Sequence, residues 1–253
     1  YNNTTNFLDP IKTSWGRNQY GEGYDGRSLS TILVFDNILT YNKSIKKHNF
    51  DVMVGSSWTG SKWSQSYING SHYMNGDIQT LNAANKISWN GTGTSASEWA
   101  IMSFVGRLAY NYDSKYLLTV NMRSDGSSKL HPDHRWGTFP SVSAAWRISS
   151  EEFMKDYSWI NDLKLRGGWG QTGNQSGLGD YAYLLRYNIN RVQWWEEGNE
   201  HAVPTITQAN LRTKDLTWET TTQTNIGIDF TVLDSRLTFY LDYYYKKTKD
   251  MRM

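Results

Sequence analysis

The sequence predicts an all-β protein, an antiparallel transmembrane β-barrel of which these 253 residues are an internal or C-terminal slice. Three observations predict it. Two long runs near the C-terminus alternate between apolar and polar residues, and the connections between strands alternate between short and long. Mean hydropathy is −0.66 with 15% aromatic residues, and no apolar stretch is long enough for a transmembrane helix. A barrel is compatible with that hydropathy, because every second residue of its strands can face water.

The clearest predicted strands lie at 216–232 and 236–249, with a very short turn between them. Successive side chains of a strand point to opposite faces, so each run has one apolar and one polar face. Typical soluble strands have about 5–6 residues, and these runs are more than twice as long. We expect the apolar residues to face lipid, and they are Ile226, Ile228, Phe230, Leu237, Phe239, Leu241 and Tyr243.

Six further strands are expected upstream, at about 28–41, 49–60, 99–112, 115–125, 137–149 and 162–173. The first of them is apolar on both faces, and the others alternate. The polar positions of the set predict a wet, hydrogen-bonding wall, formed by Arg107, Asn121, Arg123, Arg147, Arg166, Glu219, Asp229 and Asp242. The alternative is that these charges only pair with each other across strands, as in any wide barrel.

The expected connections between strands alternate between compact and mostly long ones along the chain. Those expected to be compact are 42–48, 113–114, 150–161 and 233–235, and those between them are mostly long, above all 61–98 and 174–215. Outer-membrane barrels have short periplasmic turns and longer extracellular loops. In 150–161, Ser150 followed by acidic residues predicts one helical turn on the periplasmic rim. If the short connections are periplasmic and the long ones extracellular, both ends of the chain lie on the extracellular side. We therefore expect further strands beyond both ends rather than a complete eight-stranded barrel.

Tryptophans are frequent in or near the expected loops. Trp194 and Trp195 are adjacent, and Trp63 and Trp89 lie in the loop expected at 61–98. Flat aromatic rings stack on the C–H faces of sugars, so these four are candidate substrate contacts. The alternatives are loop packing and contact with a partner protein. The aromatic residues expected in an interfacial girdle include Tyr112, Tyr116 and Trp146.

No residue set predicts catalysis, a cofactor or a metal site. His131 and His134 lie close in sequence, with Asp133 between them. Two histidines on a loop without a firm third ligand are a weak signal for a metal site, and the chain has no cysteine. The formal net charge is +2, which does not suggest a nucleic-acid partner. We therefore expect a protein that is not an enzyme.

An ordered series of motifs carries a resemblance to a known family. The motifs are GRLAYNY at 106–112, RSDGSS at 123–128, RWGTFPSVSAAWRIS at 135–149, LKLR at 163–166, GQTGNQ at 170–175, LTWE at 216–219 and TNIGIDF at 224–230. In order and spacing the series closely resembles the SusC/RagA family of TonB-linked outer-membrane transporters, from about residue 28 to residue 250.

The resemblance implies a 22-stranded barrel with an N-terminal plug, of which residues 1–253 would be part of the barrel domain without plug or TonB box. It implies TonB-driven import of oligosaccharides or peptides through the outer membrane of a Bacteroidota-type cell. The implied partners are a SusD-like surface lipoprotein as lid, TonB, outer-membrane lipid and the glycan or peptide substrate. The polar wall would then face the lumen and the plug. The alternatives are a secreted, soluble β-rich carbohydrate-binding or adhesin domain, and a structural barrel without transport.

Overall fold

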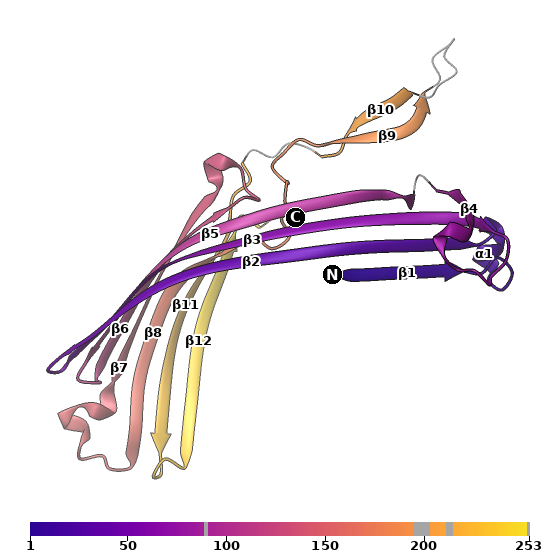
Figure 1. Ribbon diagram of the computed structural model, residues 1–253. Coiled ribbons are helices and arrows are strands. Elements are labelled where there is room, and N and C mark those ends of the chain that lie inside the picture. The colour runs from indigo at the N-terminus through magenta and orange to yellow at the C-terminus, as the bar shows by residue number, and fades with distance from the viewer. Residues whose placement is uncertain (89–90, 195–202, 211–214, 252–253) are drawn as a thin grey trace. The chain divides into compact units, whose positions relative to one another are not determined.

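The computed structural model describes residues 1–88, 91–194, 203–210 and 215–251. Ten strands form one antiparallel sheet: β1 (Asn2–Leu8), β2 (Glu22–Ile45), β3 (His48–Tyr73), β4 (Ala84–Ile87), β5 (Gly93–Tyr112), β6 (Tyr116–Ser127), β7 (Trp136–Arg147), β8 (Ile160–Asn174), β11 (Glu219–Val232) and β12 (Leu237–Lys249). Their order is β1-β2-β3-β5-β6-β7-β8-β11-β12, with β4 beside β3 (Figure 1). A separate hairpin pairs β9 (Tyr187–Trp194) with β10 (Val203–Gln208).

Helices are short. They are α1 (Ser14–Gln19) and 3-10 turns at Leu81–Ala83, Pro132–His134, Ile148–Ser150 and Glu152–Met154. Within the described ranges, no helix has the length and hydropathy that a membrane crossing requires.

All eight predicted strands are present, and the all-β fold class is confirmed. Several of their boundaries were wrong, and β2 extends beyond the expected 28–41 at both ends. The loop expected at 61–98 is largely strand, because β3 continues to Tyr73 and β5 begins at Gly93. Burial alternates along the end of β3, but its serines, lysine and aromatic residues give little hydropathy contrast between the two faces. The strand expected from 216 begins only at Glu219, because the preceding residues pack into a loop cluster.

The chain divides into two compact units, one of residues 1–34 and 59–99 and the other of residues 35–58 and 100–253. The unit boundaries after residues 34, 58 and 99 all fall inside strands, in β2, β3 and β5. In the first unit, β1 pairs with β2, and the buried Tyr73 ring lies edge-on to Phe7 at 5.0 Å. Gly21 and Gly23 leave the room that this ring occupies, since a Cβ at either position would meet it.

The connection rhythm holds only in part. The connections 46–47, 113–115 and 233–236 are short and 74–92 and 175–218 are long, but 148–159 is longer than 128–135. Because neighbouring strands are antiparallel, the short connections share one end of the sheet. Asp113 and Ser114 both have positive φ, 52° and 56°, which is the type I′ geometry that suits tight hairpins.

The register of the second unit sorts its side chains into two faces. One cross-strand row of neighbours runs Tyr112, Tyr116, Trp146, Leu165, Ile228 and Leu241. A second row, three positions further along each strand and on the opposite face, runs Ala109, Thr119, Ser143, Gly168, Asn225 and Tyr244. We call these the apolar face and the polar face.

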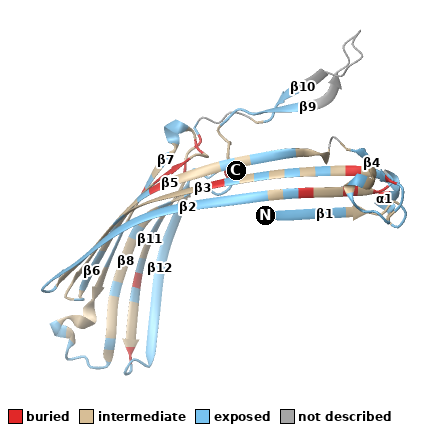
Figure 2. Ribbon diagram, viewed as in Figure 1, coloured by how far each residue is buried: buried red, intermediate tan, exposed pale blue. Residues whose placement is uncertain are grey.

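Little of either face is buried (Figure 2). Ile226, Leu237 and Leu241 of the apolar face are exposed, the last of them by 71%. A soluble protein rarely leaves an apolar surface of this extent open to water. The buried apolar cluster of the second unit lies instead among the long connections.

Candidate functional site

Ion pairs cross the polar face near the short-connection end. The Asp229 carboxylate accepts hydrogen bonds from Lys164 Nζ at 3.2 Å and Arg166 Nε at 2.9 Å. Arg166 also donates from Nη2 to Asp242 Oδ2 at 2.7 Å. Three neighbouring strands, β8, β11 and β12, supply the four groups, so the network joins them by charge as well as by backbone hydrogen bonds.

The other residues predicted for the polar wall also have partners. Their ion pairs are Arg107–Asp51, Arg123–Asp125 and Arg147–Asp162, with N–O distances of 3.1, 2.8 and 3.2 Å. Their hydrogen bonds run from Asn121 Nδ2 to Ser141 Oγ, 3.1 Å, and from Asn174 Nδ2 to Glu219 Oε1, 3.3 Å. Side chains that pair across strands stabilise a sheet. Most of the predicted wall residues are therefore paired with other polar side chains of the sheet.

Two adjoining hollows of about 310 Å³ each indent the same face. Ser143 and Asn225 line both of them, and we call the pair the polar hollow. On its floor, side chains of the neighbouring strands lie close over two glycines of β8. A Cβ on Gly168 would lie 2.8 Å from Asn225 Oδ1, and a Cβ on Gly170 would lie 2.8 Å from the Cβ of Ser141. The sequence did not predict this hollow, although the glycines at alternate positions of β8 were its signal.

Aromatic residues gather on the apolar face near the short-connection end. The ring of Tyr116 stacks between those of Tyr112 and Trp146, at centroid distances of 6.2 and 6.5 Å. Glu151, in the connection that follows β7, accepts hydrogen bonds from Tyr116 Oη at 2.6 Å and Trp146 Nε1 at 3.1 Å. Lys115 Nζ donates to the same carboxylate at 3.1 Å.

These three contacts favour the charged form of the Glu151 side chain. The hydrogen bond from Tyr116 contributes most to lowering the pKa of Glu151, and Trp146 and Lys115 act in the same direction. The helical turn expected around 150–161 is present as two 3-10 turns, but Ser150 ends the first rather than capping the second. Glu151 precedes the second turn, and its side chain binds the aromatic pair instead of the turn's backbone.

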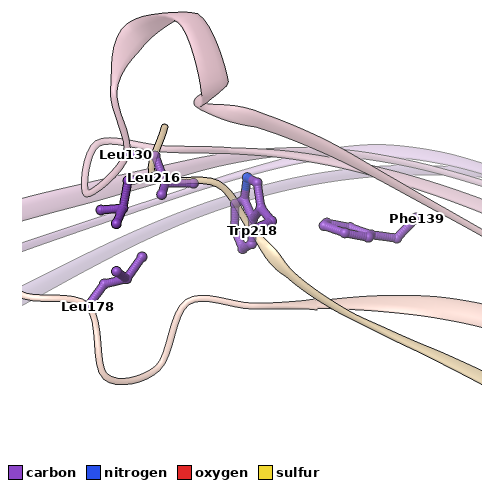
Figure 3. Close-up of a cluster of buried hydrophobic side chains, with 5 residues drawn as sticks. All are labelled: Leu130, Phe139, Leu178, Leu216 and Trp218. Atoms are coloured by element: carbon purple, nitrogen blue, oxygen red, sulfur yellow. The ribbon is translucent and has the colours of Figure 1, made fainter. Parts of the chain in front are cut away.

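A small apolar core ties the long connections together (Figure 3). Its members are Leu130, Phe139, Leu178, Leu216 and Trp218. The Trp218 indole donates to the Arg135 carbonyl at 2.9 Å, and its ring meets Phe139 edge-on at 5.5 Å. We call this group the loop cluster. It joins 128–135 to 175–218, which the sequence did not predict.

The candidate substrate tryptophans lie in different places. Trp63 is half-buried in β3, so its assignment to a loop was wrong. Trp194 is the last residue of β9, where it pairs with Val203. Trp89 and Trp195 lie outside the described residues. A role of any of the four in substrate binding stays a prediction.

Metal-binding groups do not gather in the part of the chain that the structure describes, where no three histidine, aspartate or glutamate side chains converge. His131 lies beside Asp133, with 3.3 Å between Nδ1 and Oδ2. That contact stabilises the short turn after His131.

A family model described as "TonB dependent receptor-like, beta-barrel" matches residues 1–253. The chain belongs to this family. Its members are transporters rather than enzymes, and they are barrels of the bacterial outer membrane. The apolar face and the two-sided connections are what such a barrel requires.

Individual relatives place the chain among SusC/RagA-type members. It is 34% identical to TonB-dependent receptor SusC of Bacteroides thetaiotaomicron over 247 residues, covering 94% of this chain and 23% of that protein. It is 36% identical to TonB-dependent receptor P39 of Formosa agariphila over 217 residues, covering 85% of this chain and 20% of the relative. The chain thus spans between a fifth and a quarter of the length of these relatives.

Solved structures agree in fold. The structure of the RagAB peptide transporter superposes with a TM-score of 0.80 at 24% identity, covering 91% of this chain and 25% of that one. The RagAB peptide importer in its "open-open" state gives a TM-score of 0.79. The likeness establishes the barrel fold.

Proposed function

We propose that this chain forms part of the barrel wall of a SusC-type, TonB-dependent nutrient importer. The observation that carries the proposal is the two-faced sheet, exposed and apolar on one face and polar and ion-paired on the other. The 34% identity to SusC over nearly the whole chain supports the same assignment.

In this proposal the apolar face contacts lipid and the polar face lines the lumen. Apolar residues such as Ile226, Phe230 and Leu241 would then meet hydrocarbon, while Arg166, Asp229 and Asp242 would meet water and the plug. The short connections would be periplasmic and the long ones extracellular, as in other outer-membrane barrels. The barrel would be completed to 22 strands by chain outside these 253 residues.

The mechanism is transport without bond-making. Substrate would bind on the extracellular side under a SusD-like lipoprotein, and TonB would act through a plug to open a path along the polar wall. The substrate would be an oligosaccharide or a peptide. The structurally similar RagAB is a peptide transporter, and the polar wall of this chain is compatible with either substrate.

A secreted, soluble carbohydrate-binding domain is the weaker alternative. It would have to cover the apolar face of β11 and β12, whose leucines, isoleucines and tyrosines are exposed. An exposed apolar surface of that size leads to aggregation in water.

Uptake by the full-length protein tests the proposal. We expect it in the outer-membrane fraction, released only by detergent, with a folded form that migrates faster than the boiled form on gels. We expect uptake of labelled oligosaccharides or peptides into cells that contain it, and loss of that uptake when TonB is absent. A protein released without detergent, or uptake unchanged without TonB, would contradict the proposal.

A further inference from the structure

We propose that the polar hollow is a sugar-binding subsite on the lumen wall, which holds a neutral oligosaccharide during its passage. The inference rests on the proposed importer function and adds a site to it. The hollow lies on the polar face of β7, β8 and β11, and its first part reaches Thr172 and Thr221, two residues from the ends of β8 and β11 at the long connection.

The register sets the floor of the subsite. Ser143, Gly168 and Asn225 are direct neighbours on β7, β8 and β11. One row further on, Ser141, Gly170 and Gln223 are neighbours in the same way. Each row therefore has a glycine between two polar side chains. We call the floor along the two glycines the trough, and the side chains of Asn225 and Ser141 reach over it. Each hollow of about 310 Å³ reaches the lower end of the range for ligand sites, roughly 300–1,000 Å³.

The walls of the trough carry groups that both donate and accept hydrogen bonds. Gln223 and Asn225 contribute amides, and Ser143 contributes a hydroxyl. Among the described residues, none of these three side chains makes a side-chain hydrogen bond, whereas Ser141 already accepts one from Asn121. A sugar hydroxyl also donates and accepts, so it can pair with each free group.

Charge favours a neutral ligand. Lys164 and Arg166 line the second hollow, but Asp229 and Asp242 hold both of them in ion pairs. A cation already paired with a carboxylate attracts an anionic ligand weakly. The site thus offers hydrogen bonds rather than net charge.

An aromatic residue follows on β12, one strand beyond the residues that line the hollow. Tyr244 is the direct neighbour of Asn225, on the polar face, and is 67% exposed. A tyrosine ring can cover the C–H face of a sugar while its hydroxyl bonds to water or to the ligand. A pyranose offers both parts that such a site would contact, a C–H face for the ring and hydroxyls for the amides.

Two substitutions in the full-length transporter test the subsite. Ser143→Trp fills the trough, and Tyr244→Ala removes the ring. Tyr243→Ala is the matched control, because Tyr243 is the adjacent residue on the apolar face and is 73% exposed. The probes are maltohexaose and cellohexaose, with a neutral alanine hexapeptide as the peptide arm. Migration of unboiled protein on gels verifies that each variant is folded.

We expect the wild type to bind at least one hexasaccharide, and Ser143→Trp and Tyr244→Ala to weaken that binding about tenfold, as the loss of one or two polar contacts would. Tyr243→Ala should bind like the wild type. Equal affinity in all four proteins would overturn the subsite, and so would binding of the peptide alone. Both results leave the importer function intact, whereas a wild type that imports nothing in the presence of TonB refutes that function and the subsite together.

Labelling of Ser143→Cys tests whether a sugar or the plug occupies the polar hollow. This chain has no cysteine of its own, so the introduced thiol is unique within it. We expect a membrane-impermeant maleimide to label it in the intact transporter and the bound hexasaccharide to protect it. A thiol that reacts only after the plug is deleted, with no effect of sugar, would identify the hollow as a plug contact and overturn the proposal.

Discussion

Trp146 Nε1 donates a hydrogen bond to Glu151 Oε1 across 3.1 Å, joining the apolar face at the end of β7 to the connection that follows it. Tyr116, the cross-strand neighbour of Trp146, donates to the same oxygen at 2.6 Å. Tyrosine and tryptophan gather where a membrane meets water, because the ring is apolar and the edge is polar. Here one carboxylate satisfies both polar edges, which holds the rings and the connection in one arrangement.

Acid should weaken this arrangement. The folded-state pKa of Glu151 is lowered, chiefly by Tyr116, below the value of an unfolded glutamate, about 4.3. The stabilisation is therefore present above that unfolded value and is lost as the pH falls through the folded-state pKa. We expect Glu151→Gln to lower the unfolding temperature of the full-length barrel at pH 7, and we expect this difference from the wild type to shrink as the pH falls below about 4.3.

Glu152→Gln is the control for this measurement. Glu152 pairs with Lys155 at an exposed position, 2.6 Å apart, and exposed pairs contribute little to stability. Its unfolding temperature should stay near that of the wild type at pH 7. If the two variants were equally destabilised, the bonds from the aromatic residues would not be the cause.

Removal of the Asp229 charge should destabilise the barrel. Asp229→Asn leaves Lys164 without an ion-pair partner among the described residues and removes one of the two carboxylates that hold Arg166. These groups are partly exposed, so the expected loss is about 1–2 kcal/mol, below that of a fully buried pair. Urea unfolding of the refolded barrel measures it. Asp234→Asn, in the turn between β11 and β12, should change stability by less than about 0.5 kcal/mol.

The sequence predicted strands best where hydropathy differs between their faces. Along β12, Leu237, Phe239 and Leu241 alternate with polar or amphipathic residues, so the strand and its faces were both apparent. The end of β3 has the same geometry, but Trp63, Gln65 and Tyr67 alternate with residues of similar polarity. Where side chains alternate between two faces but their hydropathy does not, the sequence alone does not reveal the strand.

Partners across strands could not be predicted in the same way. Alternation placed Asp229 on the polar face, but its bonds to Lys164 and Arg166 join residues 65 and 63 positions apart and depend on the register of β8 with β11. The loop cluster was missed for a related reason. Leu130 and Leu178 are isolated leucines among polar residues, and only the fold brings them together.

The loop cluster should open locally when Trp218 is shortened. Trp218 is 4% exposed, and truncation of a buried Trp to Ala costs about 3–5 kcal/mol. Because most of the cluster lies in the connections, we expect Trp218→Ala to make 175–218 sensitive to protease while the barrel itself stays folded. Trp136→Ala, at an exposed position, is the comparison and should leave cleavage unchanged. Unchanged cleavage in both variants would show that Trp218 does not hold the connections.

An added charge should destabilise the barrel more on the apolar face of β12 than on its polar face. Leu241 and Tyr240 are neighbours with nearly equal exposure, 71% and 72%, but they point to opposite faces. If lipid covers the apolar face, Leu241→Arg places a cation in hydrocarbon and should cost about 2–4 kcal/mol if it lies near mid-membrane. Tyr240→Arg places the cation on the polar face, where Tyr240 is the direct neighbour of Asp229, so it should cost less than about 1 kcal/mol. Folding of both variants into lipid vesicles, followed by urea unfolding, measures the difference. Equal costs would mean that the two faces meet the same solvent, which no membrane barrel allows.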